Sequence, residues 1–253
     1  MALHREASMT RLLAFLYGVL CYLIFLATFL YLIGFIGNLV VPKSIDSGIP
    51  GSFALALTTN LVLIGIFGIQ HSVMARPGFK QWWKRFIPPS IERSSYVLFA
   101  SAALILMFWL WKPITQEVWH IRMPVAVSAL WVMFALGWGV VLSCTFLIDH
   151  FDLFGLRQVY LNLKQRNYSP VGFREPFFYR LVRHPLMLGF IISFWAAPVM
   201  TVGRLIFAAG MTGYILIALQ FEERDMVTYF GEEYRKYRQR VPMLVPWHRR
   251  RHV

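Results

Sequence analysis

Charged residues are scarce in this sequence. Asp, Glu, Lys and Arg make up only 15% of its 253 residues, whereas roughly 25% of the residues in an average soluble domain are charged. Hydrophobic residues make up 58% of the chain, and the mean hydropathy is +0.56. The composition therefore excludes an ordinary soluble domain and predicts an integral membrane protein.

Motifs for disulfides, metals and soluble nucleotide sites are also lacking. The two cysteines, Cys21 and Cys144, lie inside apolar runs, so neither a disulfide framework nor a cysteine zinc site is indicated. The motifs H-E-x-x-H, G-x-G-x-x-G and G-x-x-x-x-G-K-[ST] are absent. We predict no bound metal, and we expect any cofactor to lie against the membrane helices.

Long apolar runs are abundant. Four of them approach or exceed the ~20 apolar residues that a helix needs to cross a membrane. They are Leu12–Val41, Phe53–Ala75, Ser94–Trp111 and Met123–Ile148. The longest stretch outside the runs, Asp149–His184, has 36 residues, which is too few for a soluble domain of about 100 residues. The sequence thus predicts one all-α membrane domain over residues 1–253.

The positive charges lie on alternate loops. All but four of the 25 Lys and Arg residues fall within residues 1–11, 76–93 and 149–184 or in the tail from Glu222 onward; the exceptions are Lys43, Lys112, Arg122 and Arg204. The positive-inside rule places the basic segments, and with them both termini, on the cytoplasmic side. Membrane topology thus explains the net charge of +13, and no nucleic-acid partner is indicated. We expect Arg249-Arg250-Arg251 to anchor the tail to anionic lipid.

Residues 185–221 are predicted to form a hairpin, because both ends of this apolar segment adjoin basic cytoplasmic segments. Ala196-Ala197-Pro198 and Thr201-Val202-Gly203-Arg204 supply the break. The arms are then Leu186–Pro198, which is short for a full crossing, and Leu205–Phe221. The sequence therefore predicts a polytopic helical bundle with five or six membrane segments.

The tail has the pattern of a surface helix. Apolar and aromatic residues recur there at steps of three or four: Met226, Phe230, Tyr234, Tyr237 and Val241. Arginines and acidic residues occupy the other positions. This spacing predicts a cytoplasmic amphipathic helix over Glu222–Arg240 that lies on the membrane.

Polar residues at the two ends of the hairpin are candidates for a functional site, since charges at membrane edges are rare. Arg183 and His184 precede the first arm, and Glu222 and Glu223 follow the second. If the hairpin closes, these four side chains meet in a polar pocket on the cytoplasmic side. The alternative is a set of snorkelling charges that pair at the membrane interface.

A longer pattern includes these residues. Arg183–Pro246 contains R-H-P-x-x-x-G, an apolar hairpin, E-E-R, F-G-x-x-Y-x-x-Y and V-P. This pattern resembles the C-terminal motif of the isoprenylcysteine carboxyl methyltransferase superfamily of membrane enzymes. In that superfamily the segment binds S-adenosylmethionine at the cytoplasmic face, which implies this cofactor for residues 183–246. The resemblance assigns to the cofactor Arg183, His184, Gly189, Glu222, Glu223, Tyr234 and Tyr237.

Three further segments narrow the resemblance. Gln70-His71-Ser72-Val73-Met74-Ala75-Arg76, Glu92-Arg93-Ser94-Ser95-Tyr96 and the segment from Asp149 to Gln158 are similar to those of bacterial methanethiol S-methyltransferases. That family methylates methanethiol to dimethyl sulfide with S-adenosylmethionine, which implies a small thiol substrate and a bacterial inner membrane. Two alternatives stay open. One is methylation of a larger lipid-linked substrate, and the other is a non-enzymatic NnrU-like membrane factor of nitrogen-oxide metabolism.

Methyl transfer to sulfur would require a base, because a thiolate attacks far better than a thiol. His71 and His150 are the candidates, since each is expected at the cytoplasmic end of a helix and histidine has an ordinary pKa near ~6.5. Asp149 lies next to His150 and would favour its protonated form by charge proximity. Each histidine could equally be an interface residue that is hydrogen-bonded to the backbone.

Overall fold

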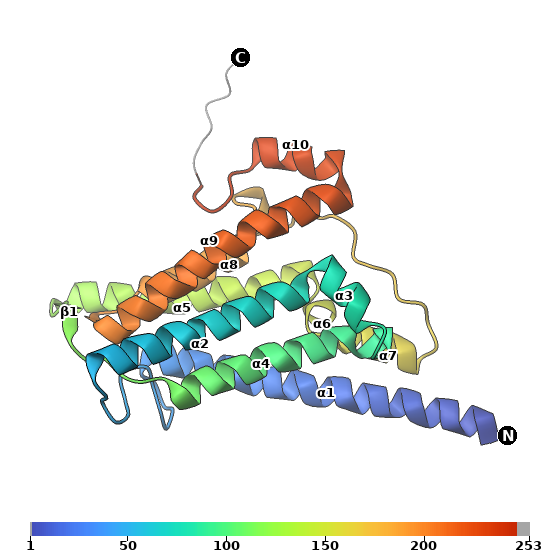
Figure 1. Ribbon diagram of the computed structural model, residues 1–253. Helices are drawn as coiled ribbons and strands as arrows, with labels where there is room; N and C mark the ends of the chain where they lie inside the picture. The colour runs from blue at the N-terminus through green and yellow to red at the C-terminus, as the bar shows by residue number, and fades with distance from the viewer. Residues whose placement is uncertain (1, 247–253) are drawn as a thin grey trace, which may run out of the picture. The chain divides into compact units, whose positions relative to one another are not determined.

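The computed structural model describes residues 2–246, with side chains from Ser8 onward. Five apolar helices are long enough to cross a membrane (Figure 1). They are α1 (Ala2–Gly37), α2 (Phe53–Ala75), α4 (Glu92–Leu110), α5 (Pro124–Ile148) and α9 (Val202–Phe230). The four crossings predicted from the apolar runs are confirmed, and α9 is the second arm of the predicted hairpin. Arg249-Arg250-Arg251 lies outside the described residues.

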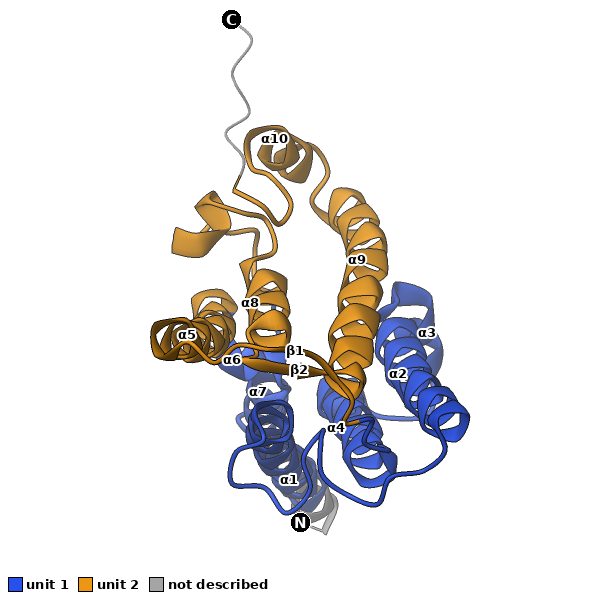
Figure 2. Ribbon diagram, turned by 90° about the vertical axis from the view of Figure 1, so that its left-hand side faces the viewer, with its two compact units in different colours: residues 1–114, 149–170 blue, residues 115–148, 171–253 orange. Residues whose placement is uncertain are grey.

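The chain forms two compact units, which Figure 2 colours separately. Unit 1 consists of residues 1–114 and 149–170, and α4 packs in it against both α1 and α2. Asn60 of α2 is fully buried and is satisfied by the backbone of Lys112, to whose carbonyl it donates at 2.8 Å. The shorter elements of this unit are α3 (Pro77–Trp83), η1 (Pro89–Ile91), α6 (His150–Leu153) and α7 (Leu156–Leu163).

Unit 2 consists of residues 115–148 and 171–253. Besides α5 and α9 it contains β1 (Glu117–His120), η2 (Phe177–Arg180), α8 (Pro185–Trp195), β2 (Val199–Thr201) and α10 (Glu232–Arg240). The two strands form a small antiparallel sheet, with Trp119 opposite Met200 and His120 opposite Val199. The sequence did not predict this sheet, because its strands have only four and three residues. Helix α8 packs against α5 and α9, and α10 packs against α9.

The predicted hairpin is confirmed at its break. Helix α8 ends at Trp195, and α9 begins at Val202 after Thr201, whose hydroxyl accepts the N–H of Arg204 at 3.1 Å. The 11 residues of α8 give a rise of about 16 Å, which is half of the ~30 Å hydrocarbon core. Residues 2–246 therefore contain five helices that can cross a membrane and a short apolar helix, α8, that cannot cross it alone.

The tail helix is divided at a different place from the one predicted. A single surface helix over Glu222–Arg240 was expected, but α9 continues to Phe230, so that Glu222 and Glu223 belong to the membrane helix. No proline or glycine lies between Glu222 and Gly231. Gly231 ends α9 with a φ of 58°, a conformation that favours glycine. The amphipathic part is α10 alone, and it buries Tyr234 and Tyr237 against Phe173 and Val241.

Helices α5 and α8 approach each other closely through two glycines. A Cβ atom on Gly189 of α8 would lie 2.7 Å from the carbonyl oxygen of Gly137 and 3.0 Å from Cγ2 of Val141. Glycine pairs of this kind let helix backbones pack tightly where lipid supplies no hydrophobic driving force. The structure thus gives Gly189 a packing role, and its assignment to the cofactor stays a prediction.

We predict that Gly189→Ala destabilises the protein by about 1–3 kcal/mol, because the added methyl group overpacks the α5–α8 contact. For a chain of this size, the loss corresponds to a decrease of about 2–12 °C in Tm. Thermal unfolding of the purified protein in detergent measures it. The matched control is Gly139→Ala on α5, where no atom lies within 4 Å of the new Cβ. Equal melting temperatures of Gly189→Ala and the control would contradict the prediction.

Candidate functional site

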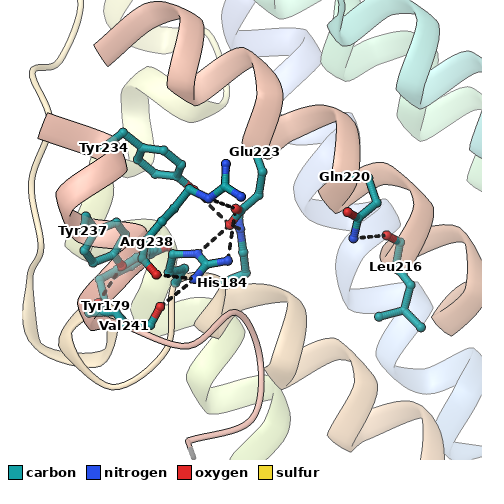
Figure 3. Close-up of polar contacts among 10 residues, drawn as sticks. Tyr179, His184, Leu216, Gln220, Glu223, Tyr234, Tyr237, Arg238 and Val241 are labelled. Carbon is teal, nitrogen blue, oxygen red and sulfur yellow. Dashed lines mark hydrogen bonds and ion pairs between the residues drawn. The ribbon is translucent and has the colours of Figure 1, made fainter. Parts of the chain in front are cut away.

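A buried carboxylate, that of Glu223, lies at the centre of the polar cluster. Glu223 stands on α9, about two turns before the helix ends at Phe230, and it is 6% exposed. Figure 3 shows side chains from the start of α8 and from α10 converging on it. The site therefore forms where the short helix enters the membrane and the last long helix leaves it.

Three side chains donate hydrogen bonds to the Glu223 carboxylate, and a fourth, that of Arg238, forms an ion pair with it. Arg183 places Nε 2.6 Å from Oε1 and Nη2 3.0 Å from Oε2. Nε2 of His184 lies 2.9 Å from Oε1 and carries a proton, because a carboxylate only accepts. The Tyr234 hydroxyl donates to Oε1 at 3.1 Å, and Nε of Arg238 lies 3.0 Å from Oε2.

These contacts saturate Glu223. Four hydrogen bonds and the Arg238 ion pair converge on two oxygens, which offer roughly four lone-pair sites. The side chains of Arg183 and Glu223 are only 10% and 7% exposed, so this is a buried network and not a set of snorkelling charges. Of the four side chains predicted to meet, Arg183, His184 and Glu223 do so, whereas no hydrogen bond or ion pair among the described residues joins Glu222 to them.

Arg183 also holds the segment that follows α10. Its Nη1 donates to the carbonyls of Val241 at 2.6 Å and Arg238 at 3.3 Å. The backbone N–H groups of Arg183 and His184 donate to the carbonyls of Pro242 at 2.9 Å and Met243 at 3.1 Å. Because Pro185 follows at the first position of α8, the start of this helix is fixed by its own sequence and by the tail.

Two tyrosines of α10 pack beside the network: Tyr234 donates to Glu223, and the ring of Tyr237 contacts that of Tyr234. Tyr234 and Tyr237 pack around Phe173, and the Tyr237 hydroxyl donates to the Tyr179 carbonyl at 2.6 Å. Burial and the nearby Glu223 charge raise the pKa of Tyr234 above its ordinary value, and burial followed by the Glu175 charge does the same for the pKa of Tyr237. Both tyrosines therefore remain neutral donors at physiological pH.

Glu222 differs from its neighbour although the two are consecutive. Its side chain is half-buried and, within residues 2–246, makes no hydrogen bond or ion pair. Successive helical residues point about 100° apart, so only one of the two glutamates can face the arginines. Glu222 is thus the carboxylate of this pair that has capacity for a ligand.

An open pocket of about 360 Å³ lies beside the network. Arg183, Arg235, Arg238 and Gln239 line it, and its volume is near the lower end of the ~300–1,000 Å³ typical of small-ligand sites. Its lining is rich in hydrogen-bond donors and contains no carboxylate. The pocket therefore suits a negatively charged group.

The two candidate bases belong to unit 1. His71 on α2 stacks on Phe67, with its Nε2 2.9 Å from the Tyr96 hydroxyl. His150 begins α6, is 7% exposed, and places Nε2 2.9 Å from the Tyr22 hydroxyl. Burial lowers the pKa of His150 below its ordinary value of 6.5, and the Asp149 charge opposes this shift only in part.

Asp149 has a structural contact of its own. Its carboxylate accepts the N–H of Asp152 at 3.1 Å and thereby caps α6, the helix that begins with His150. Within the described part of the chain, no group of three or more His, Cys, Asp and Glu residues is arranged to hold a metal ion.

Three residues of these clusters were not found from the sequence. Arg238 lies four positions after Tyr234, so its place on the same face of α10 was available from helical spacing. Tyr22 and Tyr96 stand out less, because each lies within an apolar run where a tyrosine is also an ordinary packing residue. Their hydroxyl groups pair with the two histidines only because α1 and α4 bring them there.

Comparison with known proteins finds relatives that align over most of this chain. The chain is 55% identical over 239 residues to the methanethiol S-methyltransferase of Mycobacterium tuberculosis, covering 94% of this chain and 98% of that protein. It is 52% identical over 242 residues to the methanethiol S-methyltransferase of Crocosphaera subtropica, covering 96% and 95%. A more distant relative is Nurim of Bos taurus, 28% identical over 69% of this chain and 70% of that protein. No protein-family model and no solved structure matches the chain.

We predict that Glu223→Gln destabilises the protein strongly. The substitution removes the charge that offsets two guanidinium groups and turns an amide NH₂ toward donors. Breaking a buried pair in this way typically costs about 3–5 kcal/mol. Chemical or thermal unfolding of the purified protein measures the loss.

Glu222→Gln is the matched control, because it makes the same charge change one residue away without breaking a described contact. We expect its stability to lie within about 0.5 kcal/mol of the wild type. Equal stabilities of the two variants would show that the Glu223 network does not support the fold.

Proposed function

Because the chain belongs to the methanethiol S-methyltransferase family, we propose that it transfers a methyl group from S-adenosylmethionine to methanethiol, giving dimethyl sulfide. The observation that carries this proposal is the high identity to methyltransferases of that name over nearly the whole chain. The chain is a membrane methyltransferase, which disfavours the non-enzymatic alternative. The alternative that stays open is methylation of a larger lipid-linked substrate. Comparing the rates of methylation of small and lipid-linked thiols decides between the two.

The residues around the α8–α9 hairpin fit the proposed donor. When bound, S-adenosylmethionine supplies a methyl group that is activated on a sulfonium; it also carries an ammonium, a carboxylate and ribose hydroxyls. Glu222, which has no hydrogen bond or ion pair among the described residues, suits the ammonium or the hydroxyls, and the arginine-lined pocket suits the carboxylate. Aromatic faces such as those of Tyr234 and Tyr237 favour a cation.

The other assigned residues act on the geometry of this site. Glu223 holds Arg183, His184 and Tyr234 in place through the contacts described above. Gly189 lets α8 lie against α5, which fixes the helix that begins with the R-H-P motif. We therefore assign Glu223 and Gly189 to the cofactor site through the positions that they impose on its other residues.

We assign the base that activates the thiol to His150 or His71. His150 is mostly neutral at pH 7 because burial lowers its pKa, and a neutral imidazole can accept a proton. Asp149 fixes the turn that carries His150. The proton would move from the thiol sulfur to an imidazole nitrogen, leaving the thiolate to attack the methyl group.

The site is assigned to the cytoplasmic face of a bacterial inner membrane. The starts of α4 and α8 and the ends of α2, α5 and α9 all adjoin the segments that hold nearly all of the Lys and Arg residues. The positive-inside rule puts these ends, and both chain termini, in the cytoplasm.

The first test of this function is the thiol series. Purified protein in lipid discs, given S-adenosylmethionine and methanethiol, is expected to release dimethyl sulfide, which head-space gas chromatography detects. One added methylene in a fitted apolar site changes kcat/KM by roughly 10- to 200-fold, so ethanethiol should be the poorer substrate and a farnesylated thiol poorer still. Absence of dimethyl sulfide would refute the proposal, and equal or better turnover of the farnesylated thiol would favour the lipid-linked substrate.

The second test concerns the base. Loss of a general base typically lowers kcat/KM by about 10²–10⁴-fold, so we expect this loss in His150→Ala or His71→Ala while binding of S-adenosylhomocysteine is unchanged. If His150 is the base, its neutral imidazole is the active form, and protonation at low pH abolishes its activity. Because its pKa is lowered from 6.5, wild-type activity should fall only below pH 6.5.

The control for the base is His120→Ala, since His120 is an exposed histidine whose described ion pair is with Glu117 on the same strand. A wild-type rate that keeps rising above pH 8, toward the ionisation of a free thiol near about 8.5, would mean that no histidine removes the proton. Full activity in both His71→Ala and His150→Ala would lead to the same conclusion.

A further inference from the structure

The pocket beside the Glu223 network is built from arginines with different amounts of free capacity. Arg183 uses Nε and Nη2 on Glu223 and Nη1 on two backbone carbonyls. Its donors are directed into the fold, and it contributes charge to the pocket more than contacts. The residues that can recognise a ligand there are therefore Arg235 and Arg238.

Arg238 is only partly used. Its Nε pairs with Glu223, while 45% of its side chain is exposed, and no hydrogen bond of its two terminal nitrogens is found among the described residues. A guanidinium has five N–H donors in a planar fork. The fork of Arg238 therefore retains donors for a planar oxyanion at the pocket.

Arg235 is held only weakly. Its Nη1 lies 3.3 Å from Oε2 of Glu232, and the two side chains are 59% and 62% exposed. An exposed pair of this type contributes little to stability. Arg235 can thus exchange this partner for a ligand at small cost.

The charge around the pocket is not balanced. Arg183, Arg235 and Arg238 bring three positive charges, while Glu223 and Glu232 bring two negative ones. One positive charge remains, and the amide of Gln239 adds a neutral donor. The pocket is therefore complementary to one singly charged oxyanion, and it disfavours a cation.

We propose that this pocket binds the carboxylate of the amino-acid part of the methyl donor, with Arg235 and Arg238 as its direct contacts. The inference rests on the proposed function, which supplies the donor. The headgroup phosphate of an anionic lipid is the other source of a singly charged oxyanion. A phosphate would accept hydrogen bonds from the same two arginines, so the experiment must separate the two sources.

The experiment compares S-adenosylhomocysteine with its decarboxylated analogue, by calorimetry on the full chain in lipid discs of neutral phosphatidylcholine. A charge-assisted hydrogen bond corresponds to about tenfold in affinity or more. Wild type should prefer the carboxylated ligand by at least about tenfold. Because Arg238 remains as the second contact, Arg235→Gln should lower this preference several-fold without weakening the binding of the analogue.

Arg235→Gln is the decisive variant because Arg235 does not touch Glu223. Arg238→Gln should reduce the preference as well, but it also removes one contact of the network. The matched control is Lys236→Gln, an exposed cation on the same helix that does not line the pocket; it should keep the wild-type preference. Thermal unfolding checks that each variant is folded.

Two results would overturn the inference in distinguishable ways. If wild type and Arg235→Gln show the same preference for the carboxylated ligand, the carboxylate lies elsewhere although the donor assignment stands. If wild type binds neither ligand, the donor assignment fails and the inference fails with it.

A second set of discs containing anionic phosphatidylglycerol tests the other source. The expected result is an affinity for S-adenosylhomocysteine within about twofold of that in neutral discs. Competition by the anionic lipid that disappears in Arg235→Gln but persists in Lys236→Gln would assign the pocket to a headgroup phosphate, and would overturn the inference.

Discussion

The burial of one carboxylate at the end of a membrane helix determines the arrangement of the whole C-terminal region. A carboxylate removed from water costs several kcal/mol unless it is paired and fully hydrogen-bonded. Glu223 obtains its partners from the start of α8 and from α10. Meeting this requirement brings three separate segments together, and Arg183 then binds the carbonyls that follow α10. Two residues that line the arginine pocket, Arg183 and Arg238, are held in place by their ion pairs with Glu223.

At the opposite end of the hairpin, the main constraint is that the backbone N–H and C=O groups of the turn need hydrogen-bond partners. Helix α8 is too short to cross the membrane, so the chain turns where unpaired N–H and C=O groups would be costly. The segment before α5 supplies their partners: Ile121 donates to the Pro198 carbonyl at 2.9 Å, and Val202 donates to the Gln116 carbonyl at 2.8 Å. The indole of Trp119 donates to the Ala197 carbonyl at 3.1 Å. The small sheet thus makes a short helix tolerable, and the position of Arg183 depends on where that helix begins.

The sequence predicted those features that depend on composition and local spacing. Apolar runs gave the long helices, and the distribution of Lys and Arg required a hairpin, which brought Arg183 and His184 to Glu223. It did not predict contacts that depend on three-dimensional packing. The β1–β2 pairing joins segments some 80 residues apart. Arg238 is one of several arginines in the tail, and the sequence does not distinguish it from the others. The boundary between α9 and α10 was misplaced because the charges of Glu222 and Glu223 suggested an aqueous segment, whereas the ion pairs allow the membrane helix to continue past them.

The two consecutive glutamates differ in their free hydrogen-bonding capacity. A group that recognises a ligand must have such capacity before the ligand arrives, and the capacity of Glu223 is taken up by four hydrogen bonds and an ion pair. A second carboxylate on a different face of α9 keeps that capacity, and the neighbouring network keeps its surroundings rigid. The same reasoning applies to the arginines: Arg183 makes four hydrogen bonds within the fold and sets the geometry, whereas Arg235 and Arg238 retain exposed donors. Because these side chains are already ordered when the hairpin folds, a ligand loses little binding free energy to ordering the site.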